Sequence, residues 1–551
     1  MFDISTILKT REKYIKFISE WPEKYSENGK NFKDSFLVDE DFPLWWLTKM
    51  HQKDPEGSLV FYQLCLLENG VPLKAPIGNF KNSILIYFLR RLRFLFGILL
   101  KSIIFKLFYR FKIDSSAVLF ASVYGTTLKI TNNRLLDRYY LDLPDNIQKD
   151  ANMVAYYFSF YSKSVLDLIF ELRSLRASKQ IVFCERYLQI FDIISAFSFK
   201  NMLKYILIER KHEFRRSFNY HGQNLFWLFK NELRYSMFAE ETAMLHLLSN
   251  AINKIVKKHD IGMIISFLEL YPYSCALYYG AKKANTSTIA IAYQHAIITP
   301  AKTLYFYDRS EMSFDGDYKK GMPMPDYFIF QGSMGRDLLV ESGYPQERCF
   351  LTGSPRFDKL ADLQIKDIKA KLPANKKIVI IATSNLIKDT EKIIQIVAEV
   401  INNRDDCFFI FKPHPNWEIN KMVDKINADR YVISNEDIHQ LILMASVLIT
   451  SYSTTADEAI ALGCPAVSID TGVLVNMSSF TVIEAAPTVT DPFGLNAALD
   501  MIFYHPEKFE KYKNKWPELI AATFYKIDGK AQERVVQAIK QCLAKKEKGL
   551  K

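Results

Sequence analysis

KIVIIATS (377–384), CFFIFKPHP (407–415) and VLITSYSTTADEA (447–459) are the stretches of this sequence that decide the fold. Each contains a continuous apolar run that is followed by polar residues or prolines. Continuous apolar runs of this length are typical of buried strands in a parallel sheet. Because the carboxyl ends of parallel strands meet at one edge of the sheet, the polar residues that follow them should gather there.

Further apolar runs extend this pattern along the chain. RYVIS (430–434) and PAVSID (465–470) complete the second series, and an earlier series precedes it. Parallel strands need crossover connections, so two such series predict two doubly wound α/β domains that face each other across a cleft. The earlier series comprises AVLFAS (117–122), MVAYYFSF (153–160), QIVFCE (180–185), GMIISFLEL (262–270), STIAIAYQ (287–294) and DYFIFQG (326–332).

The sequence divides into three predicted regions. Residues 1–112 indicate a mostly helical accessory region with aromatic clusters and no alternation of strands and helices. Residues 113–355 are predicted to form the first Rossmann-like domain. Residues 356–551 are predicted to form the second one, with closing carboxyl-terminal helices. The charged stretch 356–377 is the predicted hinge between the two domains.

The composition is that of a globular protein with a basic surface. The 551 residues are 49% hydrophobic and 24% charged, which excludes a collagen-like or disordered chain. Lys and Arg outnumber Asp and Glu by 72 to 61, and this excess favours anionic partners. The seven cysteines form no C-x-x-C pair, and the first residues lack a secretory signal. We therefore predict a cytoplasmic protein.

The most hydrophobic stretch, residues 84–111, contains six Lys or Arg residues and no acidic residue. These charges interrupt it too often for a spanning helix, which needs about 20 apolar residues. One alternative is a helix that lies in the headgroup region of an anionic leaflet. The other is a core helix whose basic side chains reach the surface. The first alternative places the protein peripherally on the inner face of the cytoplasmic membrane.

A Lys-Pro-His-Pro motif, residues 412–415, directly follows the apolar run 407–411. Two prolines cannot continue a central strand, so His414 should stand at the edge of the sheet. There, its imidazole and the ammonium of Lys412 can bind a donor phosphate, with Pro415 shaping the turn. The alternative is a proline-fixed turn whose histidine only caps a neighbouring helix.

A hydroxyl-rich segment follows the strand that begins at residue 447 and opens the next helix. Thr455 and Glu458 are spaced as a capping box. Capping alone is one interpretation of these hydroxyls, but a basic His-Pro turn one crossover earlier favours a shared phosphate site. The predicted donor-binding residues are Lys412, His414, Pro415, Ser451, Ser453, Thr454, Thr455, Glu458, Ser384 at the end of 377–384, and Arg356 at the hinge.

Glu269 and His295 close two apolar runs of the first series. A carboxylate and an imidazole that face a phosphate-binding domain can deprotonate and orient an acceptor hydroxyl, so we predict both as catalytic. A solvated strand-end carboxylate and a satisfied core histidine are the structural alternatives.

Several absences narrow the function. Neither G-x-x-x-x-G-K-[ST] nor G-x-G-x-x-G occurs, which argues against an ATPase or an NAD enzyme. No recognition motif indicates nucleic acid. No metal is predicted, because basic groups and a helix start can neutralise a leaving phosphate. No oligomeric state follows from the sequence.

The order of these motifs resembles GT-B-fold transferases of bacterial surface carbohydrate assembly. The likeness spans residues 117–480 and is greatest to capsule and lipopolysaccharide glycosyltransferases that use CMP-activated acidic sugars, such as Kdo and sialic-acid transferases. In that family a His-Pro motif and a Ser/Thr motif hold the CMP phosphate. The resemblance implies this role for His414-Pro415 and for Ser453-Thr454. Asp137-Arg138-Tyr139-Tyr140 is also similar to the opening of surface-carbohydrate biosynthesis proteins.

The resemblance implies a metal-independent glycosyltransferase that moves a CMP-linked acidic sugar onto a lipid-linked glycan, with the nucleotide sugar as co-substrate and no other cofactor. CDP-glycerol glycerophosphotransferases of teichoic-acid assembly share much of the pattern and also release CMP. They carry His-Gly-Thr where this chain has His295-Ala296-Ile297, and Asp-Tyr-Ser-Ser where it has Ser451-Tyr452-Ser453-Thr454. That activity, sugar-nucleotide epimerisation and a non-catalytic scaffold are the alternatives.

Overall fold

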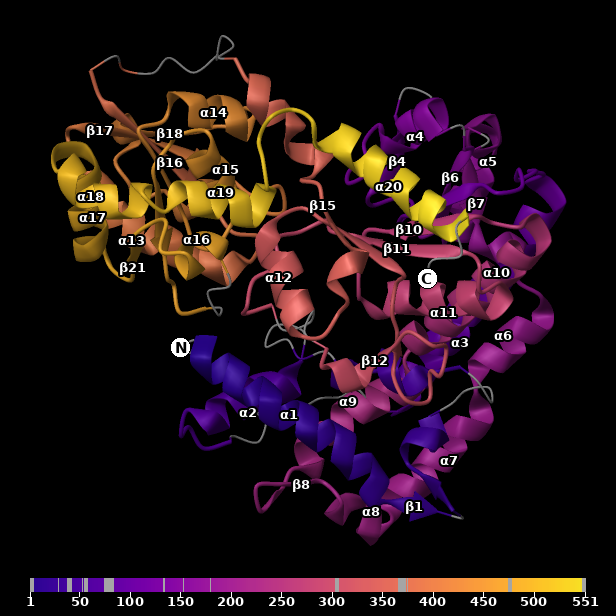
Figure 1. Ribbon diagram of the computed structural model, residues 1–551. Coiled ribbons are helices and arrows are strands. Elements are labelled where there is room, and N and C mark those ends of the chain that lie inside the picture. Colours follow the sequence, from indigo (N-terminus) through magenta and orange to yellow (C-terminus); the bar gives the residue numbers. More distant parts are fainter. Residues whose placement is uncertain are drawn as a thin grey trace.

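The computed structural model describes residues 4–27, 29–36, 42–51, 53, 58–73, 84–131, 134–151, 153–178, 180–302, 307–364, 373, 375–473 and 478–547. Within these residues, two all-parallel sheets, each covered by helices, form the two halves of the molecule (Figure 1). The α/β fold with two Rossmann-like domains is therefore as predicted.

The first sheet contains β3 (Val118–Ala121), β6 (Ala155–Ser159), β7 (Ile181–Phe183), β10 (Met263–Ser266), β11 (Ile289–Tyr293), β14 (Tyr327–Phe330) and β15 (Cys349–Leu351). Their order is β15-β14-β11-β10-β3-β6-β7. The chain starts at β3, builds one side through β7, and then crosses to the other side at β10. In the register, Ile264 lies opposite both Leu119 and Ala290. The direction of winding therefore switches between β3 and β10.

The second sheet contains β16 (Lys377–Ala382), β17 (Cys407–Lys412), β18 (Tyr431–Ile433), β19 (Val447–Thr450), β20 (Ala466–Ile469) and β21 (Thr488–Val489). Their order is β18-β17-β16-β19-β20-β21. Here the winding switches between β16 and β19, and ligands of open α/β sheets bind outside the strand ends at such a switch point. The apolar runs of the sequence predict all of these strands except β21, which has only two residues.

The helices of the first half are α1 (Ile4–Lys24), α2 (Leu59–Glu68), α3 (Ile84–Phe108), α4 (Leu143–Ala151), α5 (Val165–Ser178), α6 (Ile190–Phe197), α7 (Phe199–Arg210), α8 (His212–Arg216), α9 (Phe226–Phe238), α10 (Glu240–His259), α11 (Pro272–Ala284) and α12 (Ser333–Glu341). Those of the second half are α13 (Ile387–Asn403), α14 (Ile438–Met444), α15 (Thr455–Ala461), α16 (Ser479–Val482), α17 (Pro492–Tyr504), α18 (Pro506–Lys513), α19 (Trp516–Phe524) and α20 (Ala531–Glu547).

Short strand pairs form separate two-stranded sheets outside the two large ones. They are β1 (Ser26–Glu27) with β2 (Lys30–Asn31), β4 (Leu128–Thr131) with β5 (Arg134–Asp137), β8 (Asn219–Tyr220) with β9 (Gln223–Asn224), and β12 (Met312–Ser313) with β13 (Met322–Pro323).

Local sequence fixes where several helices begin. The Asp437 carboxylate accepts hydrogen bonds from two backbone N–H groups of α14, at His439 and Gln440. Asp491 does the same for Gly494 in α17, which also has proline at its first position. Proline is tolerated at the first position of a helix because the N–H that it lacks would have no acceptor within the helix. These caps bring each helix back onto its sheet after a short loop.

The amino-terminal region is helical, as predicted, and it shares a core with the first sheet. Tyr14, Trp21 and Trp45 are buried in the same apolar cluster as Leu119 and Ile264 of the sheet. None of the helices in the described ranges has the length and apolar character that a membrane crossing requires.

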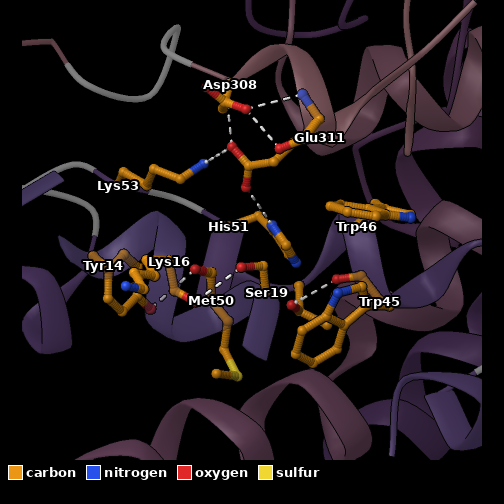
Figure 2. A network of polar contacts seen from close by, with 12 residues as sticks. Tyr14, Lys16, Ser19, Trp45, Trp46, Met50, His51, Lys53, Asp308 and Glu311 are labelled. Carbon is orange, nitrogen blue, oxygen red and sulfur yellow. Dashed lines mark hydrogen bonds and ion pairs between the residues drawn. The ribbon is translucent and has the colours of Figure 1, made fainter. Parts of the chain in front are cut away.

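A buried ion pair attaches this region to the first domain (Figure 2). Lys53 Nζ lies 2.9 Å from Glu311 Oε2, and both side chains are almost fully buried. The backbone N–H of Asp308 donates to the same carboxylate oxygen at 3.0 Å. The other carboxylate oxygen lies 3.6 Å from Nδ1 of His51, too far for a strong hydrogen bond. One carboxylate therefore joins residues far apart in the sequence.

Burial and neighbouring charge set the protonation of this cluster. Burial alone would raise the pKa of Glu311, but Lys53 and His51 together outweigh it and lower this pKa to about 2. Burial lowers the pKa of His51 to about 4, so this histidine is neutral at pH 7. Below pH 6.5 the unfolded chain binds a proton at His51 that the folded protein does not, so acidification towards pH 4 weakens folding.

We predict that Glu311→Gln lowers the free energy of unfolding by about 3–5 kcal/mol, because the substitution leaves the Lys53 ammonium buried without its countercharge. Denaturant unfolding followed by tryptophan fluorescence measures this loss. The exposed pair of Glu20 and Lys24 supplies the control: Glu20→Gln should change the stability by less than about 1 kcal/mol. Equal effects of both substitutions would contradict the assignment.

Helix α20 and a contact between α12 and α19 are among the described connections that join the halves of the molecule. α20 returns to the first domain, where Val535 and Ile539 belong to the same buried apolar cluster as Phe120 and Ile265 of its sheet; Figure 1 shows this yellow helix away from α17–α19. Between α12 and α19, the Gln331 side chain donates to the Thr523 carbonyl at 2.9 Å. The boundaries predicted at 112 and 355 remain predictions. Residues 365–372 and 374 of the predicted hinge lie outside the described residues.

Candidate active site

Glu269 and His295 form a pair at the carboxyl edge of the first sheet. Glu269 follows β10 and His295 follows β11, so the parallel topology brings them together. His295 Nδ1 lies 2.9 and 3.0 Å from the two carboxylate oxygens, and the backbone N–H of His295 donates to Oε1 at 2.7 Å. The Glu269 side chain is fully buried, and that of His295 is 15% exposed. The two predicted catalytic residues are therefore in direct contact.

The backbone at Glu269 is strained. Its φ of +36° lies in the left-handed region, which residues other than glycine seldom adopt. Such conformations cost about 1–3 kcal/mol and cluster at functional sites. The Tyr278 hydroxyl donates to the Glu269 carbonyl at 2.9 Å and helps to hold this conformation.

This geometry selects one tautomer of His295. With Nδ1–H donating to the carboxylate, Nε2 is the nitrogen that can accept a proton. Tyr139 and Phe267 pack edge-on against the imidazole, with ring centroids at 4.9 and 5.5 Å. Arg356 donates to the His295 carbonyl at 2.8 Å. The ring is thus fixed on several sides, as a general base requires.

Arg356 lies at the junction of the two domains. Burial lowers the pKa of its guanidinium, and the negative charge of Glu458 from the second domain partly offsets this effect. The guanidinium also stacks on Tyr139, with 5.1 Å to the ring centroid. The predicted role of Arg356 in donor binding remains a prediction; its observed contacts support the loop of His295.

A polar pocket of about 340 Å³ lies beside this loop, at the switch point of the second sheet. Ile297 and Lys302 line it from the first domain. Five of the predicted donor-binding residues line it from the second domain: Ser384, His414, Ser451, Ser453 and Thr454.

Hydrogen bonds within the second domain orient these side chains. The His414 backbone N–H donates to Thr383 Oγ1 at 2.8 Å, which ties the end of β17 to the end of β16. Ser451 donates to buried Asp389 at 2.7 Å. Burial and the charge of Arg138 lower the pKa of His414. Arg138 belongs to the first domain, so a charge in one domain lowers the pKa of a histidine in the other.

Besides Arg356, four predicted donor-binding residues do not line the pocket. Burial lowers the pKa of Lys412, while the acidic groups of Asp437 and Glu436 act to raise it, so its ammonium has carboxylates as neighbours. Pro415 is exposed. Thr455 hydrogen-bonds with Ser453, Oγ1 to Oγ at 2.9 Å. Their predicted roles in donor binding are not supported by contacts of their own with the pocket.

At the fourth residue, Glu458, the structure contradicts a local prediction. The capping box expected from Thr455 and Glu458 does not form, because α15 begins one residue earlier, with Thr454 as its cap. The Glu458 carboxylate instead accepts a hydrogen bond from Nε2 of His439 in α14. The predicted role of Glu458 in donor binding remains a prediction.

Sequence reasoning missed several pocket residues. Thr383, Asn385 and Ser478 line the pocket, as do Lys302 and the hydrogen-bonded pair of Asp457 and Ser479, 2.6 Å apart. Burial raises the pKa of Asp457 to about 7. Ser478 and Ser479 stand at the start of a helix, as Ser453 and Thr454 do, and this pattern could have indicated them. The other missed residues belong to no sequence motif.

A larger cavity, of about 570 Å³, lies at the opposite edge of the first sheet, near the start of β11 and β14. It contains none of the predicted site residues. Within the described ranges, no group of three His, Cys, Asp or Glu side chains could hold a metal ion.

The comparisons with known proteins concern the same part of the chain. Residues 273–458 match the family described as CDP-Glycerol:Poly(glycerophosphate) glycerophosphotransferase. This range contains His295, Ile297 and Lys302 as well as pocket residues from Thr383 to Asp457. The match supports a transferase of cell-surface polymer assembly, and either a glycosyl or a glycerophosphate group is compatible with it. Among curated proteins, no relative matches the sequence.

Solved structures with a similar chain course have low sequence identity. UDP-GlcNAc 2-epimerase from Neisseria meningitidis is 11% identical, with 77% of this chain and 100% of that chain covered and a TM-score of 0.45. The wall teichoic acid polymerase TagF is 12% identical, with 84% and 99% covered and a TM-score of 0.39. The calicheamicin glycosyltransferase CalG4 is 13% identical, with 79% and 99% covered and a TM-score of 0.46. Likenesses at this level carry no argument about function.

We predict that Glu269→Gln lowers kcat roughly 10²–10⁴-fold and leaves donor affinity unchanged, because an amide does not fix the imidazole tautomer or stabilise its protonated form. Steady-state kinetics together with donor titration measure the two effects. Glu232→Gln is the matched control, because Glu232 is also a buried carboxylate that accepts a backbone N–H. An unchanged kcat in the Glu269 variant would exclude His295 as the base.

Proposed function

We propose that this protein transfers glycerophosphate, or a related polyol phosphate, from a CDP-linked donor to a hydroxyl group of a cell-surface polymer. The observation that carries this proposal is the Glu269–His295 pair, whose loop continues into the wall of a hydroxyl-rich pocket. The family match supports it, because the matched residues include His295 and most of that pocket.

The chemistry follows from the positions of these groups. Nε2 of His295 takes the proton of the acceptor hydroxyl, and the acceptor oxygen attacks the phosphorus that carries the polyol. A new P–O bond to the acceptor forms, the pyrophosphate P–O bond to CMP breaks, and CMP leaves. The protonated imidazole is stabilised by Glu269 and returns its proton to solvent. Lys302, His414 and the pocket hydroxyls bind the departing phosphate.

The acceptor and the location are parts of the same proposal. A polymer that grows on a lipid carrier is available at the inner face of the cytoplasmic membrane, where a peripheral enzyme can reach it. Transfer without a metal ion is consistent with Lys302 at the pocket, since a cation there offsets the charge of the leaving group. Full activity in the presence of EDTA is the expected result.

Glycosyl transfer from a CMP-linked acidic sugar is the second candidate. One observation favours it: Ile297 lines the pocket at the position where the glycerophosphotransferase pattern carries threonine. An apolar side chain at this position changes what the pocket can hydrogen-bond. Both activities release CMP and both use the same base, so product analysis with each donor separates them.

We predict that CMP and CDP-glycerol raise the melting temperature of the protein and that UDP does not, because a ligand of the native state stabilises it by mass action. His414→Ala should weaken CMP binding roughly tenfold, the loss expected for a hydrogen bond to a charged phosphate. His505→Ala, at an exposed histidine before α18, is the matched control. Stabilisation by UDP alone would overturn the proposed donor.

We also predict that binding of CMP weakens as the pH rises through about 7. The raised pKa of Asp457 keeps this pocket carboxyl largely protonated below that value, whereas its charged form repels a phosphate. In Asp457→Asn this loss of affinity should be absent, because the amide stays neutral. Calorimetric titrations at pH 6 and pH 8 measure the change, and the same dependence in both proteins would assign it to another group.

A further inference from the structure

The exposed large apolar side chains of the described residues are not scattered evenly. Seven lie on α3 and three lie on each of α5, α6 and α7. A patch of more than a few hundred Å² of apolar surface generally marks an interaction site. We call the exposed side of these four helices the apolar face.

On α3, the exposed residues form one stripe along the helix. Their spacing of three and four residues, with one longer step, places them on a single side. The opposite side is buried, and Arg91 fixes it there by donating to the Met237 and Ala196 carbonyls at 2.8 and 2.6 Å. The helix therefore cannot turn to hide the stripe, which comprises Leu85, Leu89, Leu92, Phe96, Ile103 and Leu107.

The other three helices continue the same face. α3 packs against both α5 and α6. Phe88 of α3 contacts Phe197 of α6, whose ring stacks on Phe199 at the start of α7. Figure 1 shows α5, α6 and α7 along one side of the molecule. Their most exposed apolar residues are Leu166 and Phe170 on α5, Phe191 and Ile194 on α6, and Phe199 and Leu207 on α7.

The charges around the apolar face are positive. α3 contains no acidic residue, and Arg90 and Arg93 are exposed beside its stripe. Arg173 on α5 and Lys200 on α7 are exposed as well. Across the described side chains of the four helices, Asp167 is the one acidic residue classed as exposed. Apolar residues with basic neighbours match the interface of an anionic bilayer, where acyl chains lie beneath negative headgroups.

We propose that α3, α5, α6 and α7 together form a docking surface for an anionic membrane, with the apolar side chains entering the boundary between headgroups and acyl chains. This goes beyond the stretch 84–111 that the sequence indicated, because it assigns the surface to four helices held in one face. We propose a lipid bilayer as the occupant because the basic residues around the apolar face complement anionic headgroups, whereas a neutral protein surface would not complement them. The proposal does not depend on the chemistry of the pocket.

Sedimentation with vesicles of phosphatidylglycerol and phosphatidylcholine tests this surface without donor or acceptor. The full-length protein should bind these vesicles and bind pure phosphatidylcholine vesicles at least about tenfold more weakly. The double variant Phe170→Ser and Phe191→Ser, at side chains 84% and 76% exposed, should lose roughly tenfold or more in affinity. Both residues protrude into solvent, so the fold should tolerate the change.

Phe493→Ser is the matched control, because Phe493 is 86% exposed on α17 of the second domain. It should bind vesicles as the unmodified protein does. Arg90→Glu with Arg93→Glu should remove the preference for anionic lipid.

Absence of vesicle binding, or an equal loss in the Phe493 variant, would overturn the proposal. So would a dimer in solution that dissociates in the Phe170 and Phe191 variant, since a second copy would then cover the face. CMP binding should persist in every variant, which separates this test from that of the proposed function.

Discussion

The close approach of α12 and α19 is the constraint on which the site depends. A methyl group at Gly332 would lie 2.1 Å from the Ala522 carbonyl oxygen, so no larger residue fits there while the two helices keep their distance. Next to it, Gln331 donates to the Thr523 carbonyl through its side chain and to the Gln294 side chain through its backbone N–H at 2.9 Å. Gln294 directly precedes His295. The loop of His295, the proposed base, is therefore bonded to the same segment that touches the second domain.

This arrangement explains why the two parts of the site lie on different domains yet form one unit. The pocket takes most of its wall from the second sheet, but Ile297 and Lys302 complete it from the loop of His295. Lys302 donates to the carbonyl of Ile297, which keeps this loop compact. If the domains separated, His295 would leave the pocket together with its loop. The position of His295, the proposed base, relative to the pocket is thus set by the contact of backbone with backbone at Gly332.

The fold could be predicted from the sequence because a strand buried on both faces has a composition that few other segments share. CFFIF before Lys412 is such a case. The return of α20 to the first domain could not be predicted, because an amphipathic helix shows that it covers a surface but not which one. The site shows the same division. Glu269, His295 and His414 lie two or three residues beyond strand ends, so topology placed them at the sheet edges. Lys302 lies on a loop and Asp457 lies inside a helix, so no strand end in the sequence marked them. The hydrogen-bond partner of Glu458 is a histidine of another helix.

The apolar face illustrates a further limit of sequence patterns. Helices such as α6 carry apolar residues on both sides, with Ile193 buried and Phe191 and Ile194 exposed, and such a sequence normally indicates a helix in the core. Only the packing shows that none of the described residues covers one of these sides. In water, each of these side chains keeps apolar surface exposed at a cost of about 25 cal/mol per Å² relative to its burial. Covering the four helices with acyl chains removes that cost, and the rigid attachment of Arg91 ensures that the protein itself cannot remove it by rearranging.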